Sequence, residues 1–329
     1  MSTFTLLHEH VATTTTTQPP EKAQAGWSVA STSSRGVLVD YKDLVVDGAK
    51  FRAIRLRART TLLRWHVGST DPALHASVPV DANQHIDWTN EGLAGVVAVF
   101  NGGFKQSAKA GGEVVDNVTL APLVKGDMTI ALDASGHWEM GVWGSANFPS
   151  KKFVATTYRQ NLGPMVLNGQ PTSAVLSKSF MAWGDPLKEH PATPRTGLGV
   201  DAKGNLVFVA SETGVLPVDI AKALVAAGAV SGMELDMNPY WPILGAAKSP
   251  QHFAPGTYPV QLPGGGHSPT IYATGWERDF FVALAEPNAW TCSWQAPGIS
   301  TTQTGAQPQP LKTVGSGCSP TTTTSSAAG

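Results

Sequence analysis

Apolar and polar residues alternate with the two-residue period of a β-strand over much of the chain, and turn residues interrupt this alternation at short intervals. Residues 36–58 predict two strands joined by a tight turn at Asp47-Gly48. Residues 128–143 and 197–210 predict two more hairpins, and Asn168-Gly169 marks a further tight turn. The pattern therefore indicates a protein built mainly from antiparallel hairpins.

Helical periodicity is rare in the chain. LPVDIAKALVAAGAV (216–230) predicts one amphipathic helix that begins near Pro217 and ends at Gly228. A second helix is expected within residues 85–95, just before the continuous apolar run 95–100, which predicts a fully buried strand. We therefore predict an α+β fold in a single globular domain, with mostly antiparallel or mixed sheets and few helices.

The composition narrows the class of protein. Charged residues make up 14% and hydrophobic residues 42% of the 329 residues, which is typical of a packed globular chain. The formal net charge is −1 and no basic block occurs, so nucleic acid is not an expected partner. No apolar run is long enough to span a bilayer, and the opening MSTFTLLHEH lacks the pattern of a signal peptide.

The two ends of the chain differ in composition from the middle. Thr-, Pro- and Ser-rich stretches predict a disordered linker over 1–34 and a loose tail over 288–329, around a folded domain at 35–287. Such stretches are typical of linkers outside the cell, and a frayed tail has the same composition. Cys292 and Cys318 lie in the tail. We expect a secreted or cell-surface protein in which they form a disulfide, with two free thiols as the alternative.

The stretch GMELDMNPYWP (232–242) places acidic residues at the end of a short strand. Strand alternation assigns its side chains to two faces, with Met233, Leu235 and Met237 on one and Glu234, Asp236 and Asn238 on the other. Pro239 ends the strand because it has no N–H to donate. We expect the apolar face to pack against the 217–228 helix and the polar face to line a cleft.

These polar residues have more than one chemical use. Two carboxylates on one strand face perturb each other's titration, so Glu234 and Asp236 are candidates for acid–base catalysis. Together with Asn238 they also form a set of hard oxygen ligands, so a Ca²⁺ or Mg²⁺ site is an alternative. An exposed edge strand is the simplest alternative, but the neighbouring Tyr240 and Trp241 favour a site, because aromatic rings suit a sugar face.

Two further segments carry candidate chemistry. In VFNGGFK (99–105) the predicted buried strand ends at Asn101-Gly102-Gly103, where the glycines allow a sharp turn and a close approach of a ligand to the backbone. In TPRTGLGV (193–200) Arg195 opens a strand, and its guanidinium suits an anionic group such as a phosphate. An ordinary Gly-Gly turn and a surface salt bridge are the simpler alternatives.

Taken in order, these segments resemble the phosphodiester glycosidase family, whose members include lysosomal enzymes that remove N-acetylglucosamine from mannose 6-phosphate. The shared features are Asn101-Gly102-Gly103-Phe104, Pro194-Arg195-Thr196 at the start of a hairpin, a helix that closes at Gly228-Ala229, Leu235-Asp236 at a strand tip, and the segment 158–170. The resemblance covers most of residues 90–285. After Leu-Asp the family usually continues with Gly-Gly-Gly-Ser, whereas the stretch here resembles a branch of exported actinobacterial proteins.

The resemblance implies a hydrolase that cleaves the bond between an anomeric carbon and a phosphodiester oxygen in a glycan or in a cell-wall or capsule polymer. Because the phosphate leaves as a stable anion, neutralising its charge matters more than protonating it. Asp236 is then the first candidate for the catalytic carboxylate, Glu234 is the second, and Arg195 is the candidate phosphate clamp. The candidates for substrate binding are Asn101, Gly102, Gly103, Lys105, Arg159, Asn161, Asn238 and Trp241, and Trp241 is expected to stack on the sugar ring.

Two other functions fit the same residues. The first is a glycan-binding module that keeps the scaffold without catalysis. The second is a metal-dependent hydrolase that binds Ca²⁺ or Mg²⁺ through Glu234, Asp236 and Asn238. A zinc site is not expected, because the histidines lack ligand spacing and two cysteines cannot form a thiolate site unaided.

Overall fold

The computed structural model describes residues 24–70, 85–86, 95–177, 179–185, 190–248, 258, 260–262 and 267–285, together with the backbone of two short strands at 290–293 and 317–320. Every strand pair in these residues is antiparallel, and helices are few, as the sequence predicts. The part of the predicted second helix at 87–94 lies outside the described residues. No helix in the described ranges is long and apolar enough to cross a membrane.

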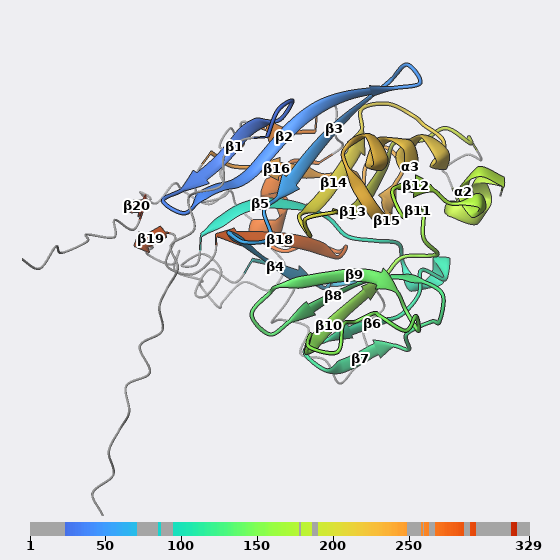
Figure 1. Ribbon diagram of the computed structural model, residues 1–329, viewed down its shortest axis with the longest axis horizontal. Coiled ribbons are helices and arrows are strands. Elements are labelled where there is room, and N and C mark those ends of the chain that lie inside the picture. Colours follow the sequence, from blue (N-terminus) through green and yellow to red (C-terminus); the bar gives the residue numbers. More distant parts are fainter. Residues whose placement is uncertain are drawn as a thin grey trace, which may run out of the picture.

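Three antiparallel sheets make up the domain (Figure 1). The largest has the order β1 (Ser28–Ser33), β2 (Gly36–Val46), β3 (Ala49–Leu56), β14 (Leu206–Ser211), β13 (Arg195–Asp201), β15 (Ala229–Met237), β11 (Val166–Leu167) and β12 (Gln170–Pro171). The second has the order β17 (Val260–Gln261), β16 (Leu244–Ala246), β5 (Val96–Asn101), β18 (Phe280–Ala285) and β4 (Thr61–His66). The third has the order β7 (Val118–Ala121), β6 (Glu113–Val115), β10 (Ala155–Gln160), β8 (Met128–Asp133) and β9 (Trp138–Val142).

The helical elements are short. The α-helices are α2 (Ser173–Ser177) and α3 (Pro217–Ala226), and the 3₁₀ turns are η2 (Gln106–Ala108), η3 (Phe180–Trp183) and η5 (Pro269–Ala273). The predicted start of α3 is confirmed: Pro217 occupies its first turn, and the backbone N–H of Leu216 donates to the Asp219 carboxylate at 2.8 Å. The predicted hairpins are also present. At the β2–β3 turn both Asp47 (φ 49°) and Gly48 (φ 83°) have positive φ, which a tight two-residue hairpin requires.

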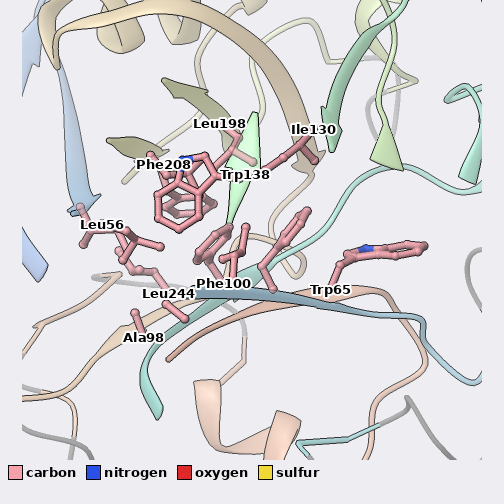
Figure 2. Packing of buried hydrophobic residues seen from close by; sticks show 14 of the residues in the cluster. Leu56, Trp65, Ala98, Phe100, Ile130, Trp138, Leu198, Phe208 and Leu244 are labelled. Carbon is pink, nitrogen blue, oxygen red and sulfur yellow. The ribbon is translucent and has the colours of Figure 1, made fainter. Parts of the chain in front are cut away.

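The central core draws its side chains from all three sheets (Figure 2). Phe208 comes from the eight-stranded sheet, Phe100 from the sheet of β5, and Trp138 from the sheet of β8. The rings of Phe100 and Phe208 lie with centroids 4.8 Å apart, which links two sheets by aromatic contact. Burial of this shared core fixes the sheets relative to one another and therefore fixes where their strand ends meet.

Helix α3 covers the opposite face of the eight-stranded sheet, in a second cluster of buried residues. It approaches closely over Gly197, where an added Cβ would lie 2.9 Å from Ile220 and 3.0 Å from Leu224. Met233 and Leu235 instead belong to the central core. The expectation that they pack against the helix is therefore wrong, because the glycine-lined face of the sheet is the one that admits α3.

The edges of the predicted domain also differ in detail. The first strand begins at Ser28, so the boundary predicted at residue 35 lies inside the first hairpin. Trp27 anchors this end, because the Arg55 guanidinium lies over its ring at 4.1 Å. In the tail, β19 (Trp290–Ser293) and β20 (Gly317–Pro320) pair with Cys292 opposite Cys318, while their side chains lie outside what the structure describes. The disulfide stays a prediction.

Candidate active site

Strand ends from all three sheets meet around the Asn101-Gly102-Gly103 turn. Strand β5 ends at Asn101, and the next N–H, of Gly102, donates to the carbonyl of Asp279 just before β18 at 2.9 Å. The N–H of Asp236, near the end of β15, donates to the carbonyl of Gly102 at 2.9 Å. The turn thus joins the end of the buried strand to the acidic tip of β15, as the order of the motifs predicts.

The paired glycines of this turn are required by close neighbours. A Cβ on Gly102 would overlap the carboxyl group of Asp279. A Cβ on Gly103 would lie 2.8 Å from both Arg159 Nη2 and Asn161 Oδ1. The sequence predicts a close approach at these glycines, and in this structure protein side chains make that approach.

Two asparagines tie the site's backbone together. Asn101 donates from Nδ2 to Thr196 Oγ1 at 2.9 Å and accepts the N–H of Ile243 at 3.1 Å. Asn161 accepts the N–H of Phe104 at 2.9 Å and donates to the carbonyl of Glu234 at 2.7 Å. Both residues lie at the predicted site, and their hydrogen bonds hold its strands in register.

Glu234 and Asp236 have different partners because the register of β15 shifts between them. Arg195 of β13 pairs with Met237, whereas Gly197 pairs with Glu234. Between these two pairs β15 contains one residue more than β13, as in a β-bulge. Directly paired residues share a face of the sheet, so Glu234 lies on the α3 side with Gly197. The strict alternation assumed from the sequence therefore fails before Met237, which packs with Phe104.

Arg195 and Glu234 form an ion pair that is fully enclosed. Arg195 also donates from Nη1 to the carbonyl of Trp183 at 2.8 Å and from Nε to the carbonyl of Val215 at 3.2 Å. Among the described residues, Glu234 Oε2, Arg195 Nη2 and Trp183 Nε1 are buried without a hydrogen-bond partner. This pair lies inside the protein, beneath the surface of the site.

Asp236 forms its ion pair with Arg278, and each side chain keeps 6% of its surface exposed. The Asp236 carboxylate also accepts the N–H of Met237 at 2.8 Å. The Arg278 guanidinium lies over the ring of Trp241, 4.8 Å from its centroid. His267 extends this aromatic cluster, with its ring centroid 6.2 Å from that of Trp241 and 4.8 Å from that of Trp276.

A third buried ion-pair group lies behind the turn. Arg159 donates from Nε to Asp279 Oδ2 at 2.8 Å, contacts Glu113 at 3.1 Å and donates to the carbonyl of Phe104 at 2.7 Å. Asp279 also accepts the indole N–H of Trp65 at 3.1 Å. The Arg159 guanidinium is therefore neutralised by two carboxylates.

The electrostatics of the site follow from its burial. The buried charged side chains here comprise more carboxylates than guanidinium groups: Glu113, Glu234, Asp236 and Asp279 against Arg159, Arg195 and Arg278. Burial raises the pKa of Glu234 to about 7 against the opposing effect of Arg195. Burial likewise raises the pKa of Asp236 to about 7, although Arg278 favours its charged form. Two carboxyl groups that titrate near neutrality are suited to acid–base chemistry.

Not every predicted residue faces this cluster. Lys105 is exposed beyond the turn. Asn238 has a positive φ of 80°, and its side chain accepts the Thr193 hydroxyl at 3.2 Å, so it shapes the turn after β15. In the described ranges no group of three or more His, Cys, Asp or Glu side chains is placed to hold a metal ion.

Sequence reasoning missed Arg278 and Asp279. Both precede the apolar strand β18, in the segment ERDFFVALA. Arg195 was identified as a guanidinium at the start of a strand, and Arg278, which lies close before β18, could have been identified by the same criterion.

Comparison with known proteins agrees with the motifs. The family model of the phosphodiester glycosidases matches residues 94–236, a range that includes β5 and ends at Asp236. None of the curated proteins is a detectable relative. The predicted resemblance to the family is thus confirmed over this segment.

Two solved structures are similar to the chain. One is the catalytic domain of zebrafish N-acetylglucosamine-1-phosphodiester alpha-N-acetylglucosaminidase, auto-inhibited by its pro-peptide, with 12% identity and a TM-score of 0.45 over 78% of this chain and 87% of that one. The other is a hypothetical protein from Synechocystis, with 11% identity and a TM-score of 0.45 over 77% of this chain and 63% of that one.

Proposed function

We propose that this chain, which carries a segment of the phosphodiester glycosidase family, is a glycosidase-type hydrolase that cleaves sugar-1-phosphodiesters. In this reaction water adds to the anomeric carbon, the bond from that carbon to the phosphodiester oxygen breaks, and a phosphate monoester leaves. The observation that carries the proposal is the ion pair Asp236–Arg278, the most exposed of the buried ion pairs around the Asn101-Gly102-Gly103 turn.

Asp236 is the proposed catalytic carboxylate. Its pKa of about 7 leaves it divided between acid and base at neutral pH, so it can accept a proton from water or stabilise positive charge at the anomeric carbon. Glu234 and Arg195, the other residues considered for catalysis, form an enclosed ion pair behind it, and we propose that they act through Asp236, because the charge on Asp236 raises the pKa of Glu234. Asn101, Asn161 and the glycines hold this arrangement.

The surface beside Asp236 supports a sugar as the substrate. Tyr240 is 55% exposed and adjoins Trp241, and aromatic rings of this kind bind the apolar face of a sugar. We propose a glycan or a wall or capsule polymer with sugar-phosphate links as the natural substrate, encountered outside the cytoplasm. The predicted Cys292–Cys318 disulfide fits that location.

Turnover separates the candidate functions. The purified chain is incubated with a synthetic sugar-1-phosphodiester, and release of free sugar is measured with and without EDTA. The proposal expects release that EDTA does not abolish. Saturable binding without release would indicate a glycan-binding module, and release that stops with EDTA and returns with Ca²⁺ or Mg²⁺ would indicate a metal-dependent hydrolase.

A further inference from the structure

The three arginines of the site differ in how close they lie to solvent. Arg159 contacts two carboxylates and retains 1% of its side-chain exposure. The side chain of Arg195 has an exposed fraction of 0% and is enclosed together with Glu234. The side chain of Arg278 has an exposed fraction of 6% and forms an ion pair with Asp236. A substrate that reaches Asp236 therefore meets Arg278 before either of the other two guanidinium groups.

The position of Arg278 also suits recognition of a phosphate. Its guanidinium lies over the ring of Trp241, and a stacked guanidinium directs its N–H groups outward in its own plane. Two parallel N–H groups in one plane match two oxygens of a phosphate group. The contact with Asp236 uses Nη2 of this guanidinium.

Trp241 comes from the part of the chain that departs from the family's glycine run. Strand β15 ends at Met237, and Asn238 then turns the chain with a φ of 80°. Its N–H donates to the carbonyl of Pro194 at 2.9 Å, and its own carbonyl accepts the N–H of Trp241 at 3.3 Å. This turn places the Trp241 indole against the face of the Arg278 guanidinium, and the His267 ring packs against the same indole.

We propose that Arg278, held by Trp241, binds the phosphate group of the substrate. This inference rests on the proposed function, because it names the residue that meets the substrate's anionic part. It assigns to Arg278 the clamp role that sequence reasoning gave to Arg195, and it leaves Arg195 as the partner of Glu234.

Binding at Arg278 has a consequence for Asp236. The positive charge of Arg278 lowers the pKa of Asp236, in opposition to burial. A bound phosphate shares that positive charge, so the Asp236 carboxylate takes up a proton from solvent as the phosphate binds. Ligand binding and protonation of the proposed catalytic group are then linked.

Calorimetry of product-like ligands tests this without turnover. A sugar 1-phosphate and the corresponding free sugar are titrated into the wild-type chain and Arg278→Gln at pH 7.5, in two buffers with different ionisation enthalpies. We expect Arg278→Gln to weaken binding of the sugar 1-phosphate about 10- to 100-fold, the loss of one charge-assisted contact. Binding of the free sugar should change less than about twofold, within the scatter of neutral substitutions. Proton uptake should accompany binding of the sugar 1-phosphate to the wild type and be absent in the variant.

Two further variants keep the test decisive. Arg278→Lys retains the charge beside Asp236 and removes the planar fork, so it should fold and still weaken sugar 1-phosphate binding selectively. Arg52→Ala, which removes an arginine paired with the exposed Asp43, is the matched control and should bind both ligands as the wild type does.

The outcomes separate this inference from the proposed function. Equal losses for both ligands, unchanged binding in both Arg278 variants, or no binding of the sugar 1-phosphate to the wild type would overturn the role of Arg278. Phosphate binding that depends on Arg278, in a chain that releases no sugar from any sugar-1-phosphodiester, would support the role of Arg278 and refute the hydrolase.

Discussion

Replacing Asp236 with asparagine should remove activity without loss of the fold. The two side chains are nearly isosteric, and the asparagine oxygen can still accept the N–H of Met237. Loss of a positioned proton-transfer group lowers the rate by about 10²- to 10⁴-fold. We therefore expect Asp236→Asn to lower the kcat for a sugar-1-phosphodiester by this factor and to leave the far-UV circular dichroism spectrum unchanged.

The raised pKa of Asp236 also predicts how the substitution changes stability. In the unfolded chain this carboxyl titrates near its ordinary value of 3.8, whereas in the folded protein its pKa is about 7. Between these values the folded state holds the proton more tightly, so the free energy of unfolding falls as pH rises through this window. The slope approaches about 1.4 kcal/mol per pH unit for one group and falls to half of that at pH 7, so the change between pH 5 and pH 7 is about 2 kcal/mol. Asparagine removes this contribution.

Urea unfolding at pH 5 and pH 7 measures this difference. We expect the wild type to lose about 2 kcal/mol more than Asp236→Asn over this interval. Glu234 titrates in both proteins, and because the charge on Asp236 raises its pKa, the difference between the two proteins combines the titration of Asp236 with this smaller coupled effect on Glu234. Asp43→Asn, at an exposed salt bridge, is the matched control and should follow the wild type. Identical pH dependence in the wild type and Asp236→Asn would refute the raised pKa, and an unfolded Asp236→Asn protein would show that the carboxylate is structural.

Two further predictions concern the scaffold. In urea unfolding, Gly102→Ala should lower the free energy of unfolding by about 3 kcal/mol, because its Cβ would overlap a neighbouring carboxyl group. The control Gly163→Ala, with nothing within 4 Å of its Cβ, should change this free energy by less than about 0.5 kcal/mol. Equal effects of the two substitutions would contradict the close packing of the turn. Cys292 and Cys318, which are paired in the backbone register of β19 and β20, should show no free thiol when the protein is produced in an oxidising compartment and denatured without reductant, and two reactive thiols would contradict the disulfide.

Local patterns predicted the strands and turns because the forces that set them are local. The positive φ of Asn168 and Gly169 follows from the residues themselves, and helix α3 follows from its apolar period and from Pro217. The buried strand 95–100 was also predictable, since an apolar run without alternation needs cover on both faces.

The site was predictable only in part, because its geometry depends on contacts between distant segments. The shift in register within β15 is set by pairing with β13, so alternation alone could not show that Glu234 and Asp236 have different partners. The ion pair of Asp236 with Arg278 joins residues 42 positions apart, and no local pattern encodes it. The same limit applies to the face of the sheet that α3 covers, which depends on glycines in two strands.

The central claim is that the bond between the anomeric carbon and the phosphodiester oxygen is the one that breaks. Isotope transfer from water tests this claim most directly. A sugar-1-phosphodiester is hydrolysed by the wild-type chain in water enriched in oxygen-18, and both products are analysed by mass spectrometry before the sugar exchanges its anomeric oxygen. Attack at the anomeric carbon predicts that the label enters the released sugar and that the phosphate monoester stays unlabelled. Label in the phosphate product would show cleavage of a phosphorus–oxygen bond and contradict the glycosidase mechanism.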